Sequence, residues 1–527
     1  MSEQRAARRP GKTIASVLGA STDPATDDDL RAPADRLSRA PLWQRQREFY
    51  DQGAEGLWGS GMVPHHITGN PTIAHTYARL ALEFLRSVPR SEGDDDPAKR
   101  PHIVEIGGGS GRFGYLFVRH LRALAPDRPF TYVLTDFAAQ RVAAWAAHPS
   151  YRPLVEEGLL DFAVLDADDL HPTEMVVSGR SLGPGSLQGP VIGIANYVFD
   201  TLRADAYVVR GGELYEATAE VPADLRSADI VWDVVPCGEL PEDVAPILET
   251  YRDTLDDTAV LVPTGALACL DLFEGLTDAP TCALVADKGH VSPLDLCSQV
   301  EPSVVPHGSG FSLMVNFDLI ARHTRRLGGV AVLPRDPARS LVVAAFVRGE
   351  VADPAGLTAA MQDHLVDTGP DNFFLVRPLL GGSESVESML ACLRLTHFDP
   401  VLLVELLPRL LETLPGVPDQ GRDEVERVLL RVWDNWFPTG EPTDLALCLG
   451  LAFSAMDRFA RAADFLELSV KEHPDSAPAA FAMGVARRGL RDLEVARRWA
   501  DRALEIEPGF SQARALRAVL VDEMEPA

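Results

Sequence analysis

The amino-acid sequence predicts an α/β protein in two parts: a doubly wound, Rossmann-like parallel sheet, followed by an all-α C-terminal domain. Between about residues 101 and 210, short apolar runs alternate with helix-like patterns. This order is typical of a parallel sheet with helices on both faces. A glycine-rich turn follows the first of these runs. Past residue 371 the patterns are helical only, and a repeat of 34 residues runs through them.

The chain of 527 residues is long enough for several domains. Residues 1–40 are polar, rich in Arg, Asp, Ala and Pro, and lack a sustained apolar period, so we expect a disordered lead-in there. An α/β domain over residues 41–350 follows, with N-terminal helices, a core at about 101–210 and a substrate-facing lobe at about 205–350. The apolar runs of that lobe either extend the sheet or form a separate one.

The elements of the core follow in order along the chain. A helix begins at about Pro71, with Asn70 as its N-cap. Four apolar runs are predicted as strands: HIVEIG (102–107), TYVLTD (131–136), DFAVLDA (161–167) and PVIGIAN (190–196). The fourth run continues into YVFDTL, where we expect a helix.

The C-terminal part carries the internal repeat. Four positions recur 34 residues later: Gly450, Ala462, Leu466 and Pro474 are followed by Gly484, Ala496, Ala500 and Pro508. This period, with small residues that let paired helices approach and a closing proline, is the tetratricopeptide (TPR) pattern. We interpret residues 422–437 as half of a degraded earlier repeat and residues 511–524 as a capping helix. Because two repeats are near the minimum for a stable stack, flanking helices must complete the domain over 371–527.

Composition and charge exclude several classes of function. The formal net charge of −28 repels nucleic-acid backbones and anionic membranes, so we expect neither as a partner. The apolar runs are too short to span a bilayer, and the basic N-terminus lacks the apolar stretch of a secretory signal. The six cysteines are scattered, without a CxxC pair or a histidine at zinc spacing. This usage indicates reduced thiols, a cytoplasmic protein and no metal site.

The glycine-rich turn excludes two common nucleotide ligands. A dinucleotide fingerprint, GxGxxG/A, begins with Gly107 and Gly109 but meets Arg112 at its third small position. A triphosphate-binding loop is excluded because no GK[ST] follows. The spacing that fits is E-x-G-x-G-x-G, formed by Glu105, Gly107, Gly109 and Gly111.

This spacing resembles motif I of the class I methyltransferases that use S-adenosyl-L-methionine (SAM), which implies their fold and their cofactor. Glycines let the backbone pass close to the amino-acid tail of SAM. Asp136 ends the second strand, where an acid typically accepts hydrogen bonds from ribose hydroxyls. Asp166, with Ala167 beside it, ends the third strand, where the resemblance implies the acceptor for the adenine amino group. The implied cofactor-binding set is Glu105, Gly107, Gly109, Gly111, Asp136, Asp166 and Ala167.

Several longer segments resemble the MidA family, a branch of these methyltransferases whose mitochondrial members methylate an arginine of a respiratory-complex subunit. The similar segments are 63–80, 193–209, 285–290 and 307–329. The chain departs from the family where Asn196 is followed by Tyr197 instead of glutamate. Losing that carboxylate disfavours arginine as the acceptor, since a guanidinium is best held by carboxylates. A TPR tail is not a standard part of this family.

Candidate residues for methyl transfer follow the fourth strand. Most of the rate of an in-line displacement comes from holding the acceptor and the methyl group in line, and a base is needed only if the acceptor loses a proton. Asn196 and Asp200 lie on one face if their segment is helical, and we place both at the transfer site. Further candidates are Tyr197, His66, His65, His307 and Asp287. The alternative for the histidines is a solvated loop position, and for Asp287 a turn cap.

Three functions are compatible with these observations. The first is methyl transfer to a protein or peptide, basic in view of the net charge, with the TPR-like domain as a docking surface. The second is a small-molecule O- or N-methyltransferase of secondary metabolism, in which the helical domain is a scaffold or forms a homodimer. The third is a non-catalytic assembly factor that keeps the fold and binds a partner.

Overall fold

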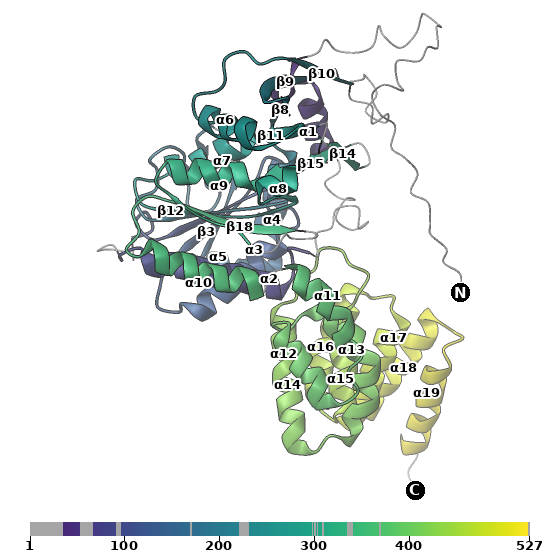
Figure 1. The fold of residues 1–527 in the computed structure, drawn as a ribbon. Coiled ribbons are helices and arrows are strands. Elements are labelled where there is room, and N and C mark those ends of the chain that lie inside the picture. Colours follow the sequence, from purple (N-terminus) through teal and green to yellow (C-terminus); the bar gives the residue numbers. More distant parts are fainter. Residues whose placement is uncertain are drawn as a thin grey trace, which may run out of the picture.

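The computed structural model describes residues 35–52, 67–90, 96–168, 171–220, 231–297, 304–307, 310–334, 341–367 and 370–524, together with residues 299 and 302. An α/β part contains the N-terminal two thirds of these residues, and a stack of helices forms the rest (Figure 1). The predicted lead-in up to residue 34 lies outside the described residues, as does His66. Within the described ranges no helix is long and apolar enough to cross a membrane.

The central sheet has seven strands in the order β17-β18-β12-β7-β2-β3-β4. Their bounds are β2 His102–Ile106, β3 Thr131–Asp136, β4 Leu160–Val164, β7 Val191–Asn196, β12 Thr281–Asp287, β17 Val330–Val332 and β18 Val342–Arg348. The five strands from β12 to β4 are parallel, and β18 is antiparallel to both of its neighbours. The predicted Rossmann-like fold class is confirmed. The strand order reverses between β2 and β7. Open α/β sheets bind ligands at such switch points.

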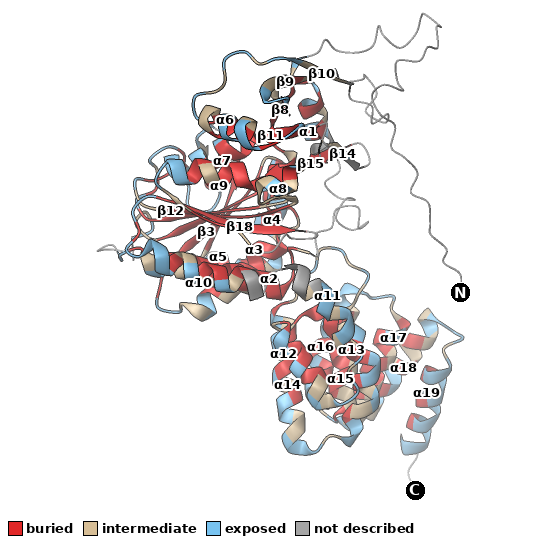
Figure 2. Ribbon diagram, in the orientation of Figure 1, coloured by how far each residue is buried: buried red, intermediate tan, exposed pale blue. Residues whose placement is uncertain are grey.

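Helices cover both faces of this sheet and enclose one apolar core on each side (Figure 2). One face carries α2 Pro71–Ser87, α3 Arg112–Leu124, α4 Ala139–Ala147, α5 Arg152–Glu156 and α10 Pro354–Asp367. The other carries α6 Ala245–Thr254, α7 Thr264–Gly275 and α9 Phe317–Arg326. Asn70 caps α2 as predicted, because its side chain accepts a hydrogen bond from the Ile73 N–H at 3.1 Å.

A second, antiparallel sheet lies above the first, in the order β1-β9-β8-β11, with β10 paired to β9. Its strands are β1 Asp35–Arg36, β8 Asp205–Arg210, β9 Glu213–Glu220, β10 Val231–Pro236 and β11 Thr258–Val262. The region past residue 205 therefore does both things that the sequence left open. Its first strands form a separate sheet, and its later strands, β12, β17 and β18, extend the central one. The remaining short elements are β5 Thr173–Glu174, β6 Ser181–Leu182, β13 Gly289–His290, α8 Pro293–Leu296, β14 Val304–His307, β15 Gly310–Leu313 and β16 Val315–Asn316.

The last residues of the predicted disordered lead-in are ordered. Asp35 and Arg36 pair with β9, and Leu37 is fully buried in the core of the second sheet. Trp43, on α1 (Leu42–Gln52), donates from its indole N–H to the Leu37 carbonyl at 2.7 Å. Residues 35–40 therefore differ from the expected disorder, because one apolar residue in a polar stretch is enough to anchor a short strand when a neighbouring element covers it.

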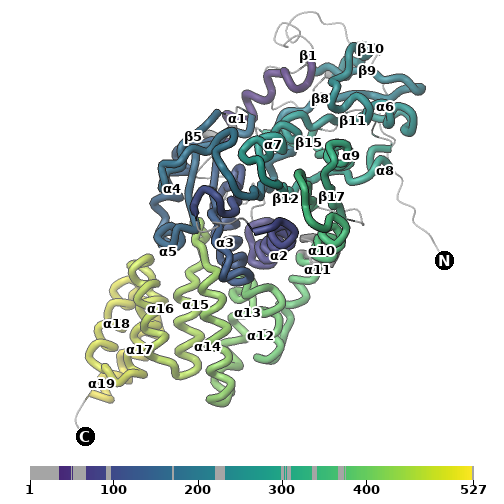
Figure 3. The backbone as a smooth tube through the Cα atoms, turned by 90° about the vertical axis from the view of Figure 1, so that its left-hand side faces the viewer, coloured from purple at the N-terminus to yellow at the C-terminus, as the bar shows by residue number. Residues whose placement is uncertain are grey.

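The C-terminal part is a stack of antiparallel helices (Figure 3). They are α11 Pro370–Leu380, α12 Val386–Leu395, α13 Pro400–Thr413, α14 Asp419–Asp434, α15 Leu445–Ala455, α16 Phe459–Glu472, α17 Ala477–Gly489, α18 Leu493–Ile506 and α19 Ser511–Met524. The two predicted repeats are α15–α16 and α17–α18. Their glycines permit close helix packing: a Cβ atom on Gly450 would lie 2.5 Å from Leu466 Cγ.

The helical part is joined to the α/β part through Phe437 and Arg112. The Phe437 ring is 1% exposed and lies between His148, Tyr115 and Tyr151, at centroid distances of 4.2, 5.2 and 5.0 Å. Arg112, 8% exposed, donates from Nε and Nη2 to the Phe437 carbonyl at 3.1 and 3.0 Å. The residue that breaks the dinucleotide pattern is thus an anchor between the two parts.

Three histidines from three elements meet at the same junction. His75 of α2 stacks on His397 at a centroid distance of 3.9 Å and meets His120 of α3 edge-on at 5.3 Å. Burial disfavours the charged rings and lowers the pKa of His75 to about 4 and that of His120 to about 3. The unfolded chain binds these protons near pH 6.5. The folded state therefore loses stability as the pH falls below that value.

We expect the His75→Gln variant to lose less thermal stability than the parent chain when the pH is lowered from about 7 to about 5. Glutamine keeps a polar side chain at the junction but takes up no proton. The measurement is Tm by scanning fluorimetry at both pH values. His473→Gln is the control, because His473 is half-exposed and caps the C-terminal end of α16. This variant should keep the parental difference in Tm between the two pH values. An unchanged difference in His75→Gln would contradict the expectation.

Candidate functional site

The glycine turn connects β2 to α3 and has the backbone that its composition predicts. Gly107, Gly109 and Gly111 have φ values of +65°, +56° and +80°, in the left-handed region that disfavours side chains. The turn is held against the sheet because the Gly108 N–H donates to the Thr135 carbonyl at 3.0 Å. A Cβ atom on Gly111 would also lie 2.6 Å from the Tyr151 hydroxyl. The turn therefore brings bare backbone to the carboxyl edge of the sheet.

Glu105, the acid of the motif, lies buried beneath this turn. The Tyr132 hydroxyl donates to its Oε2 at 2.6 Å. Burial raises the pKa of the Glu105 carboxyl to about 8, although the bond from Tyr132 lowers it. The carboxyl is therefore largely protonated at neutral pH until a cation approaches it, which is the behaviour expected of a group that receives a cationic ligand.

Asp136 and Asp166 lie at the carboxyl ends of the adjacent strands β3 and β4. Asp136 is buried, accepts from the Ala138 N–H at 3.0 Å and forms an ion pair with Arg141 at 2.6 Å. Asp166 accepts from the Asp168 N–H at 3.0 Å and pairs with Arg47 of α1. Sequence reasoning missed both arginines, since nothing in their spacing connects them to these acids.

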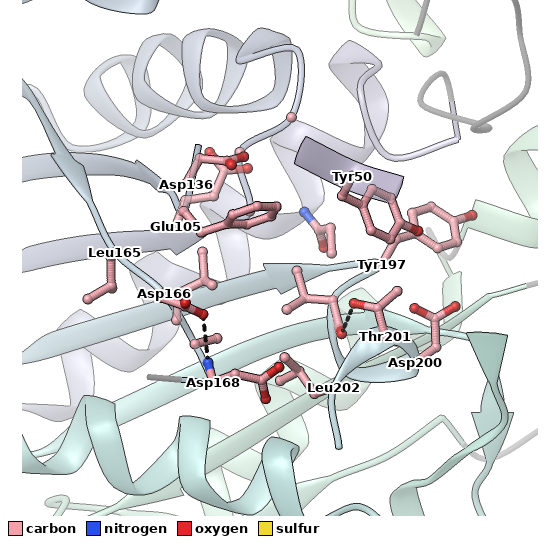
Figure 4. A pocket seen from close by; sticks show the side chains of 18 of the residues that line it. Tyr50, Glu105, Asp136, Leu165, Asp166, Asp168, Tyr197, Asp200, Thr201 and Leu202 are labelled. Atoms are coloured by element: carbon pink, nitrogen blue, oxygen red, sulfur yellow. Dashed lines mark hydrogen bonds between the residues drawn. The ribbon is translucent and has the colours of Figure 1, made fainter. Parts of the chain in front are cut away.

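A cavity of about 230 Å³ brings the predicted residues together. Six of the seven predicted cofactor residues line it, as do Asn196, Tyr197 and Asp200. Gly111, the N-cap residue of α3, is the one that does not line it. Glu105, Asp136 and Asp166 lie on one side of the cavity, and Tyr50, Tyr197 and Asp200 on the other (Figure 4). Tyr50 comes from α1, which contributes to the cavity wall.

The segment after β7 differs from the predicted helix. Tyr197 has a φ of +55°, and its N–H donates to the Ala286 carbonyl of β12 at 2.8 Å. A single 3-10 turn, Phe199–Thr201, follows. The argument that Asn196 and Asp200 share a helical face was therefore wrong, because the bond to β12 turns the chain first. Both side chains nevertheless reach the same cavity.

Asn196 is oriented from outside the cavity. Its Oδ1 accepts from the Tyr77 hydroxyl of α2 at 2.7 Å. Its Nδ2 is buried and has no hydrogen-bond partner in the described part of the chain. A buried donor without a partner is costly, and a ligand in the cavity would relieve that cost.

Asp200 is paired with Asp287, which ends β12. Their exposed fractions are 6% and 0%, and the Asp200 N–H donates to Asp287 Oδ2 at 3.1 Å. Asp287 Oδ1 accepts from the Lys288 N–H at 3.0 Å. Burial raises the pKa of Asp200 to about 7 and, together with the charge of Asp200, raises the pKa of Asp287 well above its usual range. Asp287 accepts hydrogen bonds from two backbone N–H groups, as the turn-capping alternative requires. That alternative does not explain why the carboxyl of Asp200 is buried beside it.

The structure describes no side chain for any of the histidine candidates. His65 and His66 lie outside the described residues, and of His307, at the end of β14, only the backbone is described. Four cavity residues that sequence reasoning did not propose come from elements far apart in the chain: Arg47, Tyr50, Arg141 and Lys288. Lys288 lies in the segment 285–290 that resembles the MidA family, but no motif surrounds the other three, so only the fold could identify them.

Comparisons with known proteins agree with both parts of the fold. The family model of the Fis1 C-terminal tetratricopeptide repeat matches residues 479–526, which confirms the TPR-like interpretation of α17 to α19. Two solved structures of one superfamily from Burkholderia thailandensis are similar to the α/β part. One is uncharacterised, and the other is described as a "likely methyl transferase" with S-adenosyl-homocysteine bound.

Both structures are distant. Each is 13% identical over 60% of this chain, with 87% and 90% of their own lengths covered and a TM-score of 0.38. A search of curated proteins finds no match. The chain has a Rossmann-like α/β part followed by a TPR-like domain. The closer resemblance to the MidA family stays a prediction.

Proposed function

We propose that this chain is a SAM-dependent methyltransferase that transfers a methyl group to a protein or peptide. The observation that carries the proposal is the convergence on one cavity of a left-handed glycine turn, two strand-end acids and two side chains from the end of β7. When bound, SAM supplies an electrophilic methyl group on a cationic sulfonium. The residues present fit it, since the buried carboxyl of Glu105 lies beneath the glycine turn, where it suits the cationic amino group of the amino-acid tail, which SAM and S-adenosylhomocysteine share.

The chain's own residues have separate tasks in this proposal. Gly107 and Gly109 leave room for the amino-acid tail, and Asp136 and Asp166 hold the ribose and the adenine. Asn196 and Asp200 orient the acceptor, and Tyr197 fixes their backbone through its bond to β12. Tyr50 of α1 contributes to the cavity wall and excludes water there. Positioning of this kind supplies most of the rate in a displacement that needs no covalent intermediate.

The protein or peptide acceptor is supported by charge and by the second domain. The net charge of −28 attracts a basic chain, and TPR-like stacks form concave surfaces on which peptides lie. We place the protein in the cytoplasm because its six scattered cysteines indicate reduced thiols. The small-molecule acceptor and the non-catalytic assembly factor remain as outcomes of the test.

We expect Asp136→Ala to weaken binding of S-adenosylhomocysteine by about 10- to 100-fold, since a hydrogen bond to a charged group is worth about 1.5–3 kcal/mol. Calorimetry measures the affinity. Asp136→Asn keeps an acceptor for the Ala138 N–H and separates loss of charge from loss of the turn. Asp253→Ala, on an exposed position of α6, is the matched control. Failure of the parent chain to bind would refute the cofactor assignment.

Labelling with radioactive methyl groups in a cell lysate identifies the class of acceptor. Label in a protein band supports the proposal, and label in the small-molecule fraction favours the metabolite alternative. Cofactor binding without any transfer favours the assembly factor. A variant with Asn196→Ala should lose transfer while it keeps S-adenosylhomocysteine affinity within about a few-fold, because its role is to hold the acceptor.

A further inference from the structure

Two carboxyl groups meet at the edge of the sheet beside the cofactor cradle. Asp287 ends β12, and Asp200 follows the end of β7, the parallel neighbour of β12 in the sheet. The two residues are far apart in sequence, and only the sheet brings them together. Burying two carboxyls side by side is costly, because like charges at this distance cannot both ionise in a low dielectric. Such a pair therefore lowers the stability of the folded chain unless it serves a function.

The contacts of Asp287 fix it as the inner member of the pair. Its two oxygens accept the backbone N–H groups of Lys288 and Asp200 at 3.0 and 3.1 Å, and its side chain is within hydrogen-bonding reach of the Asp200 carboxyl. In the described part of the chain neither carboxyl forms an ion pair. Because no ion pair of the described residues balances the two charges, the pair retains a proton. Asp287 holds its position by backbone bonds, and Asp200 is the member that faces the cavity.

Asp200 has an oxygen with nothing to bind. Its Oδ1 is buried and has no hydrogen-bond partner among the described residues, and the Asn196 Nδ2 in the same cavity wall is also unpartnered. One atom accepts a hydrogen bond and the other donates one. Together they present a complementary pair to a group that carries both a proton and a lone pair, such as a hydroxyl or an amine.

The titratable groups around the pair differ from it in how readily they take up a proton. Burial, together with the nearby carboxyls, raises the pKa of Tyr50 of α1 and of Tyr77 of α2, so both phenols stay protonated. Lys288 is the nearest cation, and its charge acts on Asp200 without an ion pair. The Tyr77 hydroxyl is already committed to Asn196. Glu105 also takes up a proton near neutral pH, but it lies on the opposite side of the cavity (Figure 4). Asp200 is therefore the group on its own side of the cavity, among those named, that takes up a proton near neutral pH.

We propose that the Asp200–Asp287 carboxyl pair is the proton acceptor of methyl transfer, and that the substrate atom is a hydroxyl oxygen or an amine nitrogen that loses a proton. This inference rests on the proposed function. The lone pair of that atom forms a bond to the methyl carbon while the carbon–sulfur bond breaks, and the bonding electrons stay on sulfur, which becomes a neutral thioether. The proton of the acceptor passes to Asp200 Oδ1. Asp287 is a positioning residue that keeps Asp200 basic.

The experiment compares proton release when SAM and S-adenosylhomocysteine bind. The two ligands differ by a methyl group and by the permanent charge on sulfur, which cannot itself titrate. Placing that charge beside the pair should expel up to about one proton near pH 7, whereas the uncharged ligand should expel less. Calorimetry in phosphate and in Tris, whose ionisation enthalpies differ, gives the number of protons for each ligand.

We expect the difference between the two ligands to fall by at least half in Asp200→Asn and in Asp287→Asn, and to vanish in the double variant. Asp475→Asn, on an exposed residue of the helical domain, should keep it. Asp200→Asn carries the same comparison if Asp287→Asn does not fold. In the lysate labelling at saturating SAM, Asp200→Asn should lower transfer by about 100-fold, the usual contribution of a general base.

The outcomes separate the two proposals. If neither ligand binds, the proposed function is refuted, and this inference falls with it. If both bind but release equal numbers of protons, the proposed function stands and the carboxyl pair is not at the methyl group. Label transfer that survives Asp200→Asn would likewise overturn the pair as the proton acceptor.

Discussion

Phe437→Ala is expected to lower the free energy of unfolding by about 3–5 kcal/mol and to loosen the helical domain from the α/β domain. The ring is buried among His148, Tyr115 and Tyr151. Its removal leaves a cavity at the junction, and each of the three rings loses one packing contact. The Phe437 carbonyl remains available to Arg112, which predicts a weakened contact and not a lost one. Denaturant unfolding measures stability, and small-angle scattering measures the domain separation.

The same variant is expected to bind S-adenosylhomocysteine more weakly. Phe437 packs on Tyr151, whose hydroxyl donates to the Gly111 carbonyl in the glycine turn. A freed Tyr151 ring would let that turn move. Phe510→Ala is the matched control, because its ring packs on Phe481 inside the helical domain and touches neither the junction nor the turn. Equal loss of affinity in both variants would show that general destabilisation, and not the junction, is responsible.

Much of the fold follows from local patterns in the sequence. The alternation of apolar runs and helical periods predicted the parallel strands, because such runs are buried on both faces. The 34-residue repeat predicted the helical stack, because small residues at fixed positions mark where two helices approach. The E-x-G-x-G-x-G spacing predicted a left-handed turn, since glycine is the residue that adopts it without cost.

The remaining features depend on contacts between distant residues. Arg112 bonds a residue 325 positions away, and the local sequence shows only that it spoils a dinucleotide pattern. Asp287 meets Asp200 because β12 lies beside β7, a neighbour relation that strand patterns do not specify. The bond from Tyr197 to β12 likewise overrode the helical pattern of its segment. Pairing between strands decided the last two of these outcomes, and packing between the two parts of the chain decided the first.

Gly111→Ala is expected to reduce S-adenosylhomocysteine affinity by more than about 100-fold and to lower stability as well. The φ of +80° costs a non-glycine residue about 1–2 kcal/mol. The new Cβ would also lie 2.6 Å from the Tyr151 hydroxyl and 3.0 Å from the Trp145 indole nitrogen, and both rings are buried. Neither ring can retreat, so the turn itself must shift. Calorimetry and thermal unfolding measure the two effects.

A second glycine separates strain from collision. Gly211 has a φ of +59° in the turn between β8 and β9, with nothing within 4 Å of its would-be Cβ, so Gly211→Ala has the strain alone and should keep the parental affinity. Adding Tyr151→Phe to Gly111→Ala removes the closer colliding oxygen. The double variant should regain part of the affinity that the single one loses, which a double-mutant cycle quantifies. If it regains none, the loss comes from the backbone of the turn, and the contact with Tyr151 has no part in shaping the cofactor cradle.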